Sequence, residues 1–169
     1  MTNASDPVVS PAFAGSNTTL FQGDCLAVLP TLPDNSVDLI VTDPPYFRVK
    51  KDAWDRQWNT SKLFLERRDC VFAQFYRVLR PNGSLYVFAS PQMAARVECL
   101  VTERFDVVNR ITWRKPPFST KAEMTTKEKL RSFYPASEAI IFAEHKGSDN
   151  IAKGEAGYEA KCDKLRGFI

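Results

Sequence analysis

The sequence predicts an open α/β fold, with a largely parallel sheet, helices packed on it and an antiparallel element near the sheet edge. Short β-branched apolar runs alternate with stretches of helical periodicity, and turn residues separate them. The chain has 169 residues, of which 44% are hydrophobic, so it can bury one core. We therefore expect a single domain or part of a larger one.

The elements are expected in alternating order along the chain. Strands are predicted where β-branched and aromatic residues dominate, at residues 18–22, 37–42, 84–89, 105–113 and 137–143. A short helix is predicted at residues 25–29, ending before Pro30. A longer helix is predicted to begin at Ser61, as its cap, and to stop at Pro81-Asn82-Gly83. A third is predicted from Pro91 to about Glu103. Residues 47–60 have no steady period and are expected to form a loop over the strand ends.

Composition divides the chain into three regions. Residues 1–17 are polar and rich in Pro, Ala and Ser, which predicts a flexible amino-terminal tail, and residues 146–169 are weakly patterned and predict a weakly ordered tail. Residues 18–145 form the organised region, with a long basic insertion at about 114–135. No apolar run is long enough for a membrane span and no signal-peptide layout is present, so a cytoplasmic, nucleoid-associated location is expected.

Several kinds of chemistry are excluded by residue type. The four cysteines are widely spaced without a CxxC pair, and His145 is the only histidine. This composition argues against a disulfide framework, a metal site and a Ser/His/Asp triad. None of the cysteines follows a proline, which argues against covalent attack on a base. Carboxylates, carbonyls and aromatic rings are left to do the chemistry.

Positive charge is concentrated in one segment although the net charge is only +3. Between residues 110 and 131 seven basic residues face two acidic ones. The basic residues of this segment from position 114 onward are Arg114, Lys115, Lys121, Lys127, Lys129 and Arg131. A loop that faces a polyanion has this composition, and a solvated charged loop has it too. A smaller basic cluster, Arg48, Lys50 and Lys51, is open to the same two interpretations.

The tetrapeptide Asp43-Pro44-Pro45-Tyr46 follows the predicted buried strand at residues 37–42. In open α/β sheets, ligands bind at the carboxyl ends of strands. Two prolines fix φ and remove two backbone donors, so this rigid turn presents acceptors and one aromatic ring. A strand-terminating turn with a packed tyrosine is the alternative interpretation.

These groups suit an exocyclic amine such as adenine N6, whose lone pair is delocalised into the ring. If the Asp43 carboxylate and the Pro44 carbonyl each accept one N–H, the lone pair is freed and aimed at a methyl donor. Tyr46 would stack on the base, which must leave the duplex to reach the turn. Extrusion costs a few kcal/mol and stacking returns ~1 to 3 kcal/mol, so the tyrosine decides whether the extruded state is populated.

The chain resembles the DNA amino-methyltransferases that act on adenine N6 or cytosine N4, in the group whose catalytic motif precedes the cofactor motif. The resemblance spans residues 18–144 and rests on Gly23-Asp24-Cys25, residues 36–46, residues 76–88, Trp113-Arg114-Lys115-Pro116 and residues 138–142. It implies a Rossmann-like methyltransferase fold with circularly permuted motif order. S-adenosylmethionine is the implied cofactor and double-stranded DNA the implied partner.

The resemblance also assigns roles to residues. It makes Asp43, Pro44, Pro45 and Tyr46 catalytic and base-binding, and places Asp24, Cys25, Asp43 and Pro44 at the cofactor. An aspartate before Pro-Pro-Tyr favours adenine over cytosine. The basic segment after Trp113 lies where such enzymes insert DNA-recognition elements.

One departure from the family pattern concerns the cofactor. The Phe-x-Gly-x-Gly loop that holds its methionine part is absent, since the late glycines do not follow a hydrophobic strand in that spacing. The fold is therefore expected to lack its glycine-loop half, with a separate carboxy-terminal half or a homodimer partner to complete it. Two alternatives remain, a truncated, non-catalytic DNA-binding half and a protein glutamine methyltransferase. The second is disfavoured because glutamine methyltransferases usually have asparagine at the position of Asp43.

Overall fold

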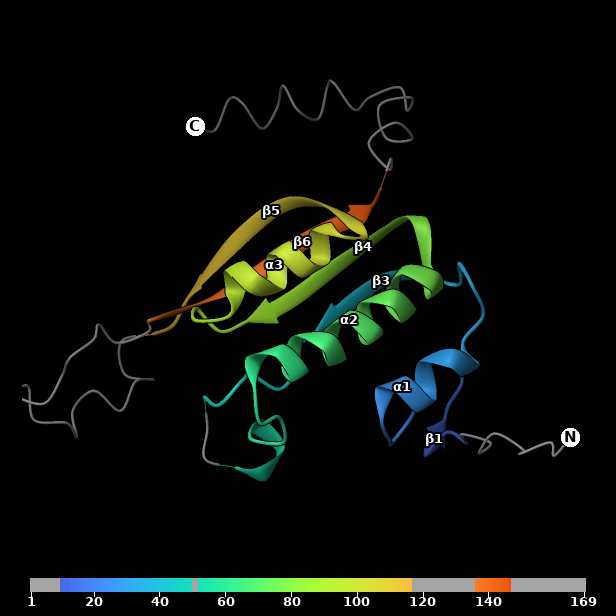
Figure 1. The fold of residues 1–169 in the computed structure, drawn as a ribbon. Coiled ribbons are helices and arrows are strands. Elements are labelled where there is room, and N and C mark those ends of the chain that lie inside the picture. The colour runs from blue at the N-terminus through green and yellow to red at the C-terminus, as the bar shows by residue number, and fades with distance from the viewer. Residues whose placement is uncertain (1–9, 50–51, 117–135, 147–169) are drawn as a thin grey trace, which may run out of the picture.

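The computed structural model describes residues 10–49, 52–116 and 136–146. They form a four-stranded sheet in the order β3-β4-β6-β5 and a separate two-stranded hairpin, β1-β2. The strands are β1 (Phe13–Ala14), β2 (Thr19–Leu20), β3 (Val37–Thr42), β4 (Leu79–Ala89), β5 (Phe105–Arg114) and β6 (Ser137–His145). The helices are α1 (Cys25–Val28), η1 (Leu29–Thr31), η2 (Ala53–Asp55), α2 (Ser61–Val78) and α3 (Ala94–Thr102). Figure 1 shows α2 and α3 on the same side of the sheet.

Three of the four strands in the sheet run in the same direction. β3 pairs in parallel with β4, whereas β6 pairs antiparallel with both β4 and β5. The reversed strand therefore lies next to the edge strand β5. The predicted α/β class, with an antiparallel element near the sheet edge, is confirmed.

The long helix α2 contributes much of the core. Its buried residues recur at helical spacing and are Phe64, Arg68, Val71, Phe72, Phe75 and Val78. The helix was expected to begin with Ser61 as its cap, but the cap is Thr60, whose hydroxyl accepts the N–H of Leu63 at 3.2 Å. Both residues are good caps, and the extended backbone of Thr60 makes it the one outside the helix.

The expected helix stop at Pro81-Asn82-Gly83 lies inside strand β4. α2 already ends at Val78, and β4 begins at the next residue. Pairing jumps from Val37 opposite Leu79 to Leu39 opposite Ser84, so the three turn residues form a bulge. A Cβ on Gly83 would lie 2.7 Å from the Leu79 side chain, which explains the glycine.

Only one face of the sheet is covered by described helices. On β4, Leu85, Val87 and Ala89 are buried beneath α2 and α3, and the residues between them point the other way. The uncovered face is apolar and carries Leu39, Val41, Tyr86, Phe88, Ile111, Trp113, Ile140 and Phe142. We call these eight residues the bare face. It includes the sheet edge at β3, where Leu39 is 54% and Val41 61% exposed.

The amino-terminal elements are shorter than expected. The strand predicted at residues 18–22 contains only Thr19–Leu20 and pairs with β1 instead of joining the main sheet. The predicted boundary of the tail at residue 17 falls within this hairpin. The predicted helix at 25–29 continues past Pro30 as the 3₁₀ turn η1, because proline is accepted at the first positions of a helical turn.

The remaining elements agree with the sequence to within a few residues. α3 begins at Ala94, three residues after the expected Pro91, and β5 and β6 match their predicted runs. Residues 117–135, which hold most of the basic segment, and the tail from residue 147 lie outside the described residues. Within the described part of the chain, no helix combines the length and apolar character that a membrane crossing requires.

Candidate active site at the carboxyl end of strand β3

The Asp43-Pro44-Pro45-Tyr46 turn begins where strand β3 ends. β3 is held by parallel pairing to β4 up to Thr42, which lies opposite Val87. Asp43 is exposed immediately afterwards, while Pro44, Pro45 and Tyr46 are half-buried. The sheet therefore carries the carboxylate outward and anchors the rest of the turn.

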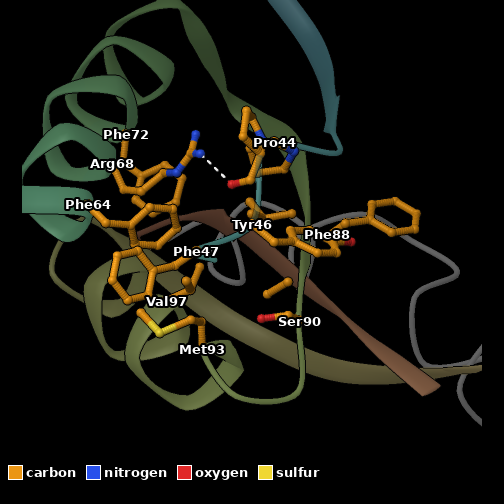
Figure 2. Close-up of a pocket in the computed structure, with 13 residues that line it drawn as sticks. Pro44, Tyr46, Phe47, Phe64, Arg68, Phe72, Phe88, Ser90, Met93 and Val97 are labelled. Atoms are coloured by element: carbon orange, nitrogen blue, oxygen red, sulfur yellow. Dashed lines mark hydrogen bonds between the residues drawn. The ribbon is translucent and has the colours of Figure 1, made fainter. Parts of the chain in front are cut away.

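One side of the turn is packed against the helices. Figure 2 shows Phe47, Phe64, Phe72, Met93 and Val97 gathered on this side, with the Arg68 side chain pointing from α2 to the turn. The space left among these groups is about 10 Å³, which corresponds to about one water molecule. A base or cofactor has no room here.

The other side of the turn opens into a cavity of about 330 Å³. Asp43, Pro44, Pro45, Tyr46, Val49, Asp55, Lys115 and Glu138 line it. This volume is in the range of small-molecule sites, which are typically ~300 to 1,000 Å³. The open side is the one from which a planar base can reach the turn.

Arg68 fixes the packed side. Its guanidinium donates to the Pro45 carbonyl at 2.7 Å, shown by the dashed line in Figure 2. It lies over the rings of Phe64 and Trp58, at 4.9 Å and 5.4 Å from their centroids, and the residue is only 6% exposed. Burial lowers the pKa of Arg68 to about 10, because water is absent to solvate the charge. The Pro45 carbonyl is thus engaged by Arg68.

Tyr46 is held from the open side by residues of two other strands. Its hydroxyl donates to Glu138 Oε2 at 3.1 Å, and Lys115 forms an ion pair with Oε1 of the same carboxylate. Burial raises the pKa of the Tyr46 hydroxyl most. The nearby Asp43 raises this pKa through a hydrogen bond and through its charge, and Glu138 raises it further. The phenol therefore remains a protonated donor.

The expected cofactor residues lie at the start of α1. Asp24 caps that helix by accepting the Leu26 N–H at 2.9 Å, and it forms an ion pair with Arg67 of α2. The Leu26 N–H and then Arg67 hold the pKa of the Asp24 carboxyl below its ordinary value. Cys25 is exposed beside it.

Two consecutive residues of α2 connect these two regions. Arg67 binds Asp24 and Arg68 binds the Pro45 carbonyl. The same helix therefore positions both the Gly23-Asp24-Cys25 segment and the Asp43-Pro44-Pro45-Tyr46 turn. The sequence-predicted cofactor and catalytic residues are anchored side by side on α2.

The residues expected to contact nucleic acid lie in different places. Arg48 has a left-handed backbone with φ of 56°, and its guanidinium folds back to donate to the Asn59 carbonyl at 2.6 Å. Lys115 lies in the wall of the cavity, whereas Arg114 is exposed at the end of β5. The others, Lys50, Lys51, Lys121, Lys127, Lys129 and Arg131, lie outside the described residues.

Sequence reasoning missed Arg68 and Glu138 as site residues. A charged residue at position 68 interrupts the apolar spacing of Phe64, Val71 and Phe75 on one helix face, and this was the available signal. Glu138 likewise lies near the start of β6, directly before an apolar run. The partner of each became visible only with the fold, because neither partner is close in sequence.

The comparisons with known proteins agree with this geometry. Residues 37–165 match the model of the N6/N4 family described as DNA methylase, so the chain belongs to this family and the resemblance is confirmed. It is 34% identical to DNA adenine methyltransferase YhdJ of Escherichia coli strain K12, covering 93% of this chain and 51% of that protein. It is 29% identical to the Type II methyltransferase M2.MboI of Moraxella bovis, covering 75% and 50%.

The fold is also shared with a solved structure. The PvuII cytosine-N4-specific DNA methyltransferase is 21% identical, with a TM-score of 0.63 over 79% of this chain and 51% of that one. A likeness at this identity concerns the fold alone. The chain spans about half the length of the relatives it matches.

Proposed function

We propose that this chain supplies the base-binding and catalytic side of a DNA methyltransferase that modifies adenine N6 in an extruded base. The observation that carries the proposal is the open cavity at the end of β3, where Asp43, Pro44 and Tyr46 meet. The packed side of the turn has no space for a ligand, so substrate approach is limited to the acceptor-rich side.

Methyl transfer requires a more nucleophilic amine than free adenine offers. The Asp43 carboxylate and the Pro44 carbonyl accept the two amine hydrogens and draw the nitrogen toward tetrahedral geometry, with its lone pair directed out of the base plane. Hydrogen bonds to a charged group contribute ~1.5 to 3 kcal/mol each. Asp43 also stabilises the positive charge that develops on the nitrogen as the methyl bond forms.

The Tyr46 ring forms one wall for the extruded base. Stacking on an aromatic ring is worth ~1 to 3 kcal/mol, which is comparable to the cost of unstacking a base. The ring is already held through its hydroxyl by Glu138, so little side-chain freedom is lost when the base binds.

Adenine is favoured as the base by the residue type at position 43 and by the name of one relative. YhdJ, with 34% identity, is an adenine methyltransferase. The cytosine-N4 enzyme PvuII shares the fold at only 21% identity. Cytosine N4 is the competing substrate because its amine can make the same two hydrogen bonds.

S-adenosylmethionine is the methyl donor in this proposal, and when bound it supplies an electrophilic methyl group. The donor set at Asp24 fits the adenosine end. A carboxylate has about four lone-pair sites, and the Leu26 N–H and Arg67 occupy only some of them. Asp24 is half-exposed and can accept a ribose hydroxyl, as acidic residues do in nucleotide sites.

A further polypeptide segment completes the enzyme by covering the bare face and the open edge of β3. A continuous apolar sheet face is unusual at a protein surface, and the relatives are about twice as long as the part matched here. The occupant is an α/β segment that adds a strand beside β3 and places apolar side chains on Leu39 and Val41. It also brings the glycine-containing loop for the methionine end of the cofactor.

Double-stranded DNA is the proposed partner, contacted by basic residues at the mouth of the cavity. Arg114 is exposed one residue before the cavity-lining Lys115, and the further basic residues up to Arg131 follow in the same segment. Contacts of this kind bind phosphates without reading sequence, so binding should weaken steeply as salt is raised.

The proposal is tested by incubating the chain and mixed-sequence DNA with methyl-labelled S-adenosylmethionine and identifying labelled nucleosides by mass spectrometry. Label in N6-methyldeoxyadenosine, lost in Asp43→Ala, is the expected result. Label in N4-methyldeoxycytidine would replace adenine by cytosine as the substrate. Equal transfer by Asp43→Ala would overturn the role of the turn. Calorimetric titration of the cofactor into the same chain measures separately whether it binds.

A further inference from the structure

The cavity contains a three-residue connection that joins Tyr46 of the Asp43-Pro44-Pro45-Tyr46 turn, which we call the catalytic turn, to two residues outside it. The Tyr46 hydroxyl donates to Glu138, which is 92 positions away in the sequence, and Lys115 pairs with the second oxygen of the same carboxylate. Pairing of β5 with β6 places Trp113 opposite Glu138, and the Lys115 N–H donates to the Ala136 carbonyl at 2.8 Å. The two strands that carry no part of the catalytic turn thus build the opposite wall of the cavity.

The carboxylate of Glu138 is unusual for its place in the fold. Its side chain is only 12% exposed, and it is the second residue of a strand whose next residues, Ala139 to Ala143, are apolar. A buried carboxylate is unfavourable unless it is paired, and apolar residues of similar volume usually serve stability equally well. Lys115, whose side chain is 33% exposed, supplies the pairing charge. What the pair provides beyond stability is a fixed acceptor opposite Tyr46.

We propose that Glu138 is a positioning residue for the target base, and that with Lys115 it holds the Tyr46 ring in the orientation on which the base stacks. This inference rests on the proposed function. The ring is constrained at both ends, because Arg68 binds the Pro45 carbonyl just before it and Glu138 binds its hydroxyl. A ring fixed in advance loses less freedom when the base stacks on it.

The hydroxyl stays protonated, which this arrangement requires. Burial and the two carboxylates, Asp43 and Glu138, raise the pKa of Tyr46. The neutral phenol can therefore donate to Glu138 through the neutral and moderately alkaline range. Loss of the Glu138 charge should lower the pKa of this one tyrosine.

The first measurement needs neither DNA nor cofactor. The chain is labelled with ¹³C at tyrosine Cζ, and the Cζ chemical shifts are compared at pH 7 in wild type, Glu138→Gln and Glu144→Gln, with Tyr46→Phe to assign the signal. Glu144 lies on the same strand and serves as the matched control. In Glu138→Gln the Tyr46 Cζ signal is expected to shift, because its hydroxyl no longer donates to a carboxylate, and in Glu144→Gln it should be unchanged. An unshifted Tyr46 signal in Glu138→Gln would refute the coupling.

The second measurement compares binding to duplexes with a mispaired adenine and to fully paired duplexes. Immobilising a free side chain costs an amount equivalent to roughly 2- to 13-fold in affinity, so Glu138→Ala and Tyr46→Phe should each reduce the preference for the mispaired duplex several-fold. The double variant should lose no more than either single variant. Additive losses would mean that Glu138 does not act through Tyr46. A wild-type chain without preference for the mispaired duplex would contradict the proposed function, while the NMR comparison still tests the Tyr46–Glu138 coupling.

Discussion

Replacing Arg68 separates the two contributions that a buried arginine makes. The residue is 6% exposed, and none of the ion pairs among the described residues includes it. Its polar contact in the site is the bond to the Pro45 carbonyl, and its apolar contacts are the rings of Phe64 and Trp58. Arg68→Met keeps the length and volume of the side chain and removes the charge.

The expected change in unfolding free energy is small because large terms oppose one another. Loss of the hydrogen bond to the Pro45 carbonyl costs ~1.5 to 3 kcal/mol, and loss of each cation–π contact costs ~0.5 to 2 kcal/mol. Against this, burying an ion without a counter-charge costs several kcal/mol, which Arg68→Met no longer requires. We expect Arg68→Met to stay within about 2 kcal/mol of wild type, with looser control of the catalytic turn and reduced methyl transfer.

Arg68→Lys should be the less stable of the two variants although it conserves the charge. An ammonium group cannot span two rings as the planar guanidinium does, and it remains desolvated. Burial lowers the pKa of such a lysine, so the unfolded chain binds more protons than the folded one at neutral pH. The stability of Arg68→Lys should therefore rise with pH up to the unfolded pKa, unlike that of Arg68→Met.

Urea denaturation of both variants at pH 7 and pH 9, followed by tryptophan fluorescence, measures these differences, and Trp58 reports directly from the site. A loss of more than about 4 kcal/mol in Arg68→Met would show that the charge is compensated by groups outside the contacts described. Arg68→Lys as stable as wild type at pH 7 would also refute the reasoning.

Three further predictions concern the catalytic turn, the cofactor segment and the bare face. Asp43→Ala should abolish methyl transfer and leave DNA binding within about threefold, because Asp43 is exposed and acts on the amine; gel-shift and transfer assays on the same preparation measure both. Asp24→Asn should lower the stability of the chain at pH 7, because the folded state holds the pKa of Asp24 below its ordinary value. The difference in stability from wild type should shrink as the pH falls below 3.8, and acid denaturation of both proteins measures it. Leu39→Glu and Val41→Glu should leave the stability of the chain within about 0.5 kcal/mol in urea denaturation, because both side chains are more than half exposed, whereas Ile40→Glu, on the core side, should unfold it. A large loss of stability in Leu39→Glu or Val41→Glu would mean that this part of the bare face is already covered within the chain.

The sequence predicted those parts of the fold in which local pattern and burial agree. The spacing of Phe64, Val71 and Phe75 predicted α2, and the β-branched run at residues 37–42 predicted β3 and so placed the catalytic turn. Pro81-Asn82-Gly83 was interpreted wrongly as a helix stop. Its turn residues are absorbed as a bulge because pairing of β4 with its neighbours outweighs their local preference.

The tertiary contacts of the site could not be obtained from local pattern. Tyr46 and Glu138 meet because β6 inserts beside β4, and sequence periodicity does not predict the order of strands in a sheet. Lys115 was expected at DNA phosphates because of its charge and its place after Trp113. Local pattern could not show that its ammonium pairs with Glu138 in the cavity wall, a contact that depends on the register of β5 and β6.

We expect an extruded base to stack on Tyr46 at the open side of the catalytic turn. Photo-crosslinking of the chain to mixed-sequence duplexes with one mispaired 5-iododeoxyuridine, followed by peptide mass spectrometry, tests it directly, because this base crosslinks to the aromatic ring on which it stacks. We predict that the crosslink maps to Tyr46 and disappears in Tyr46→Ala. Crosslinks confined to other residues, or unchanged yield with Tyr46→Ala, would contradict the claim.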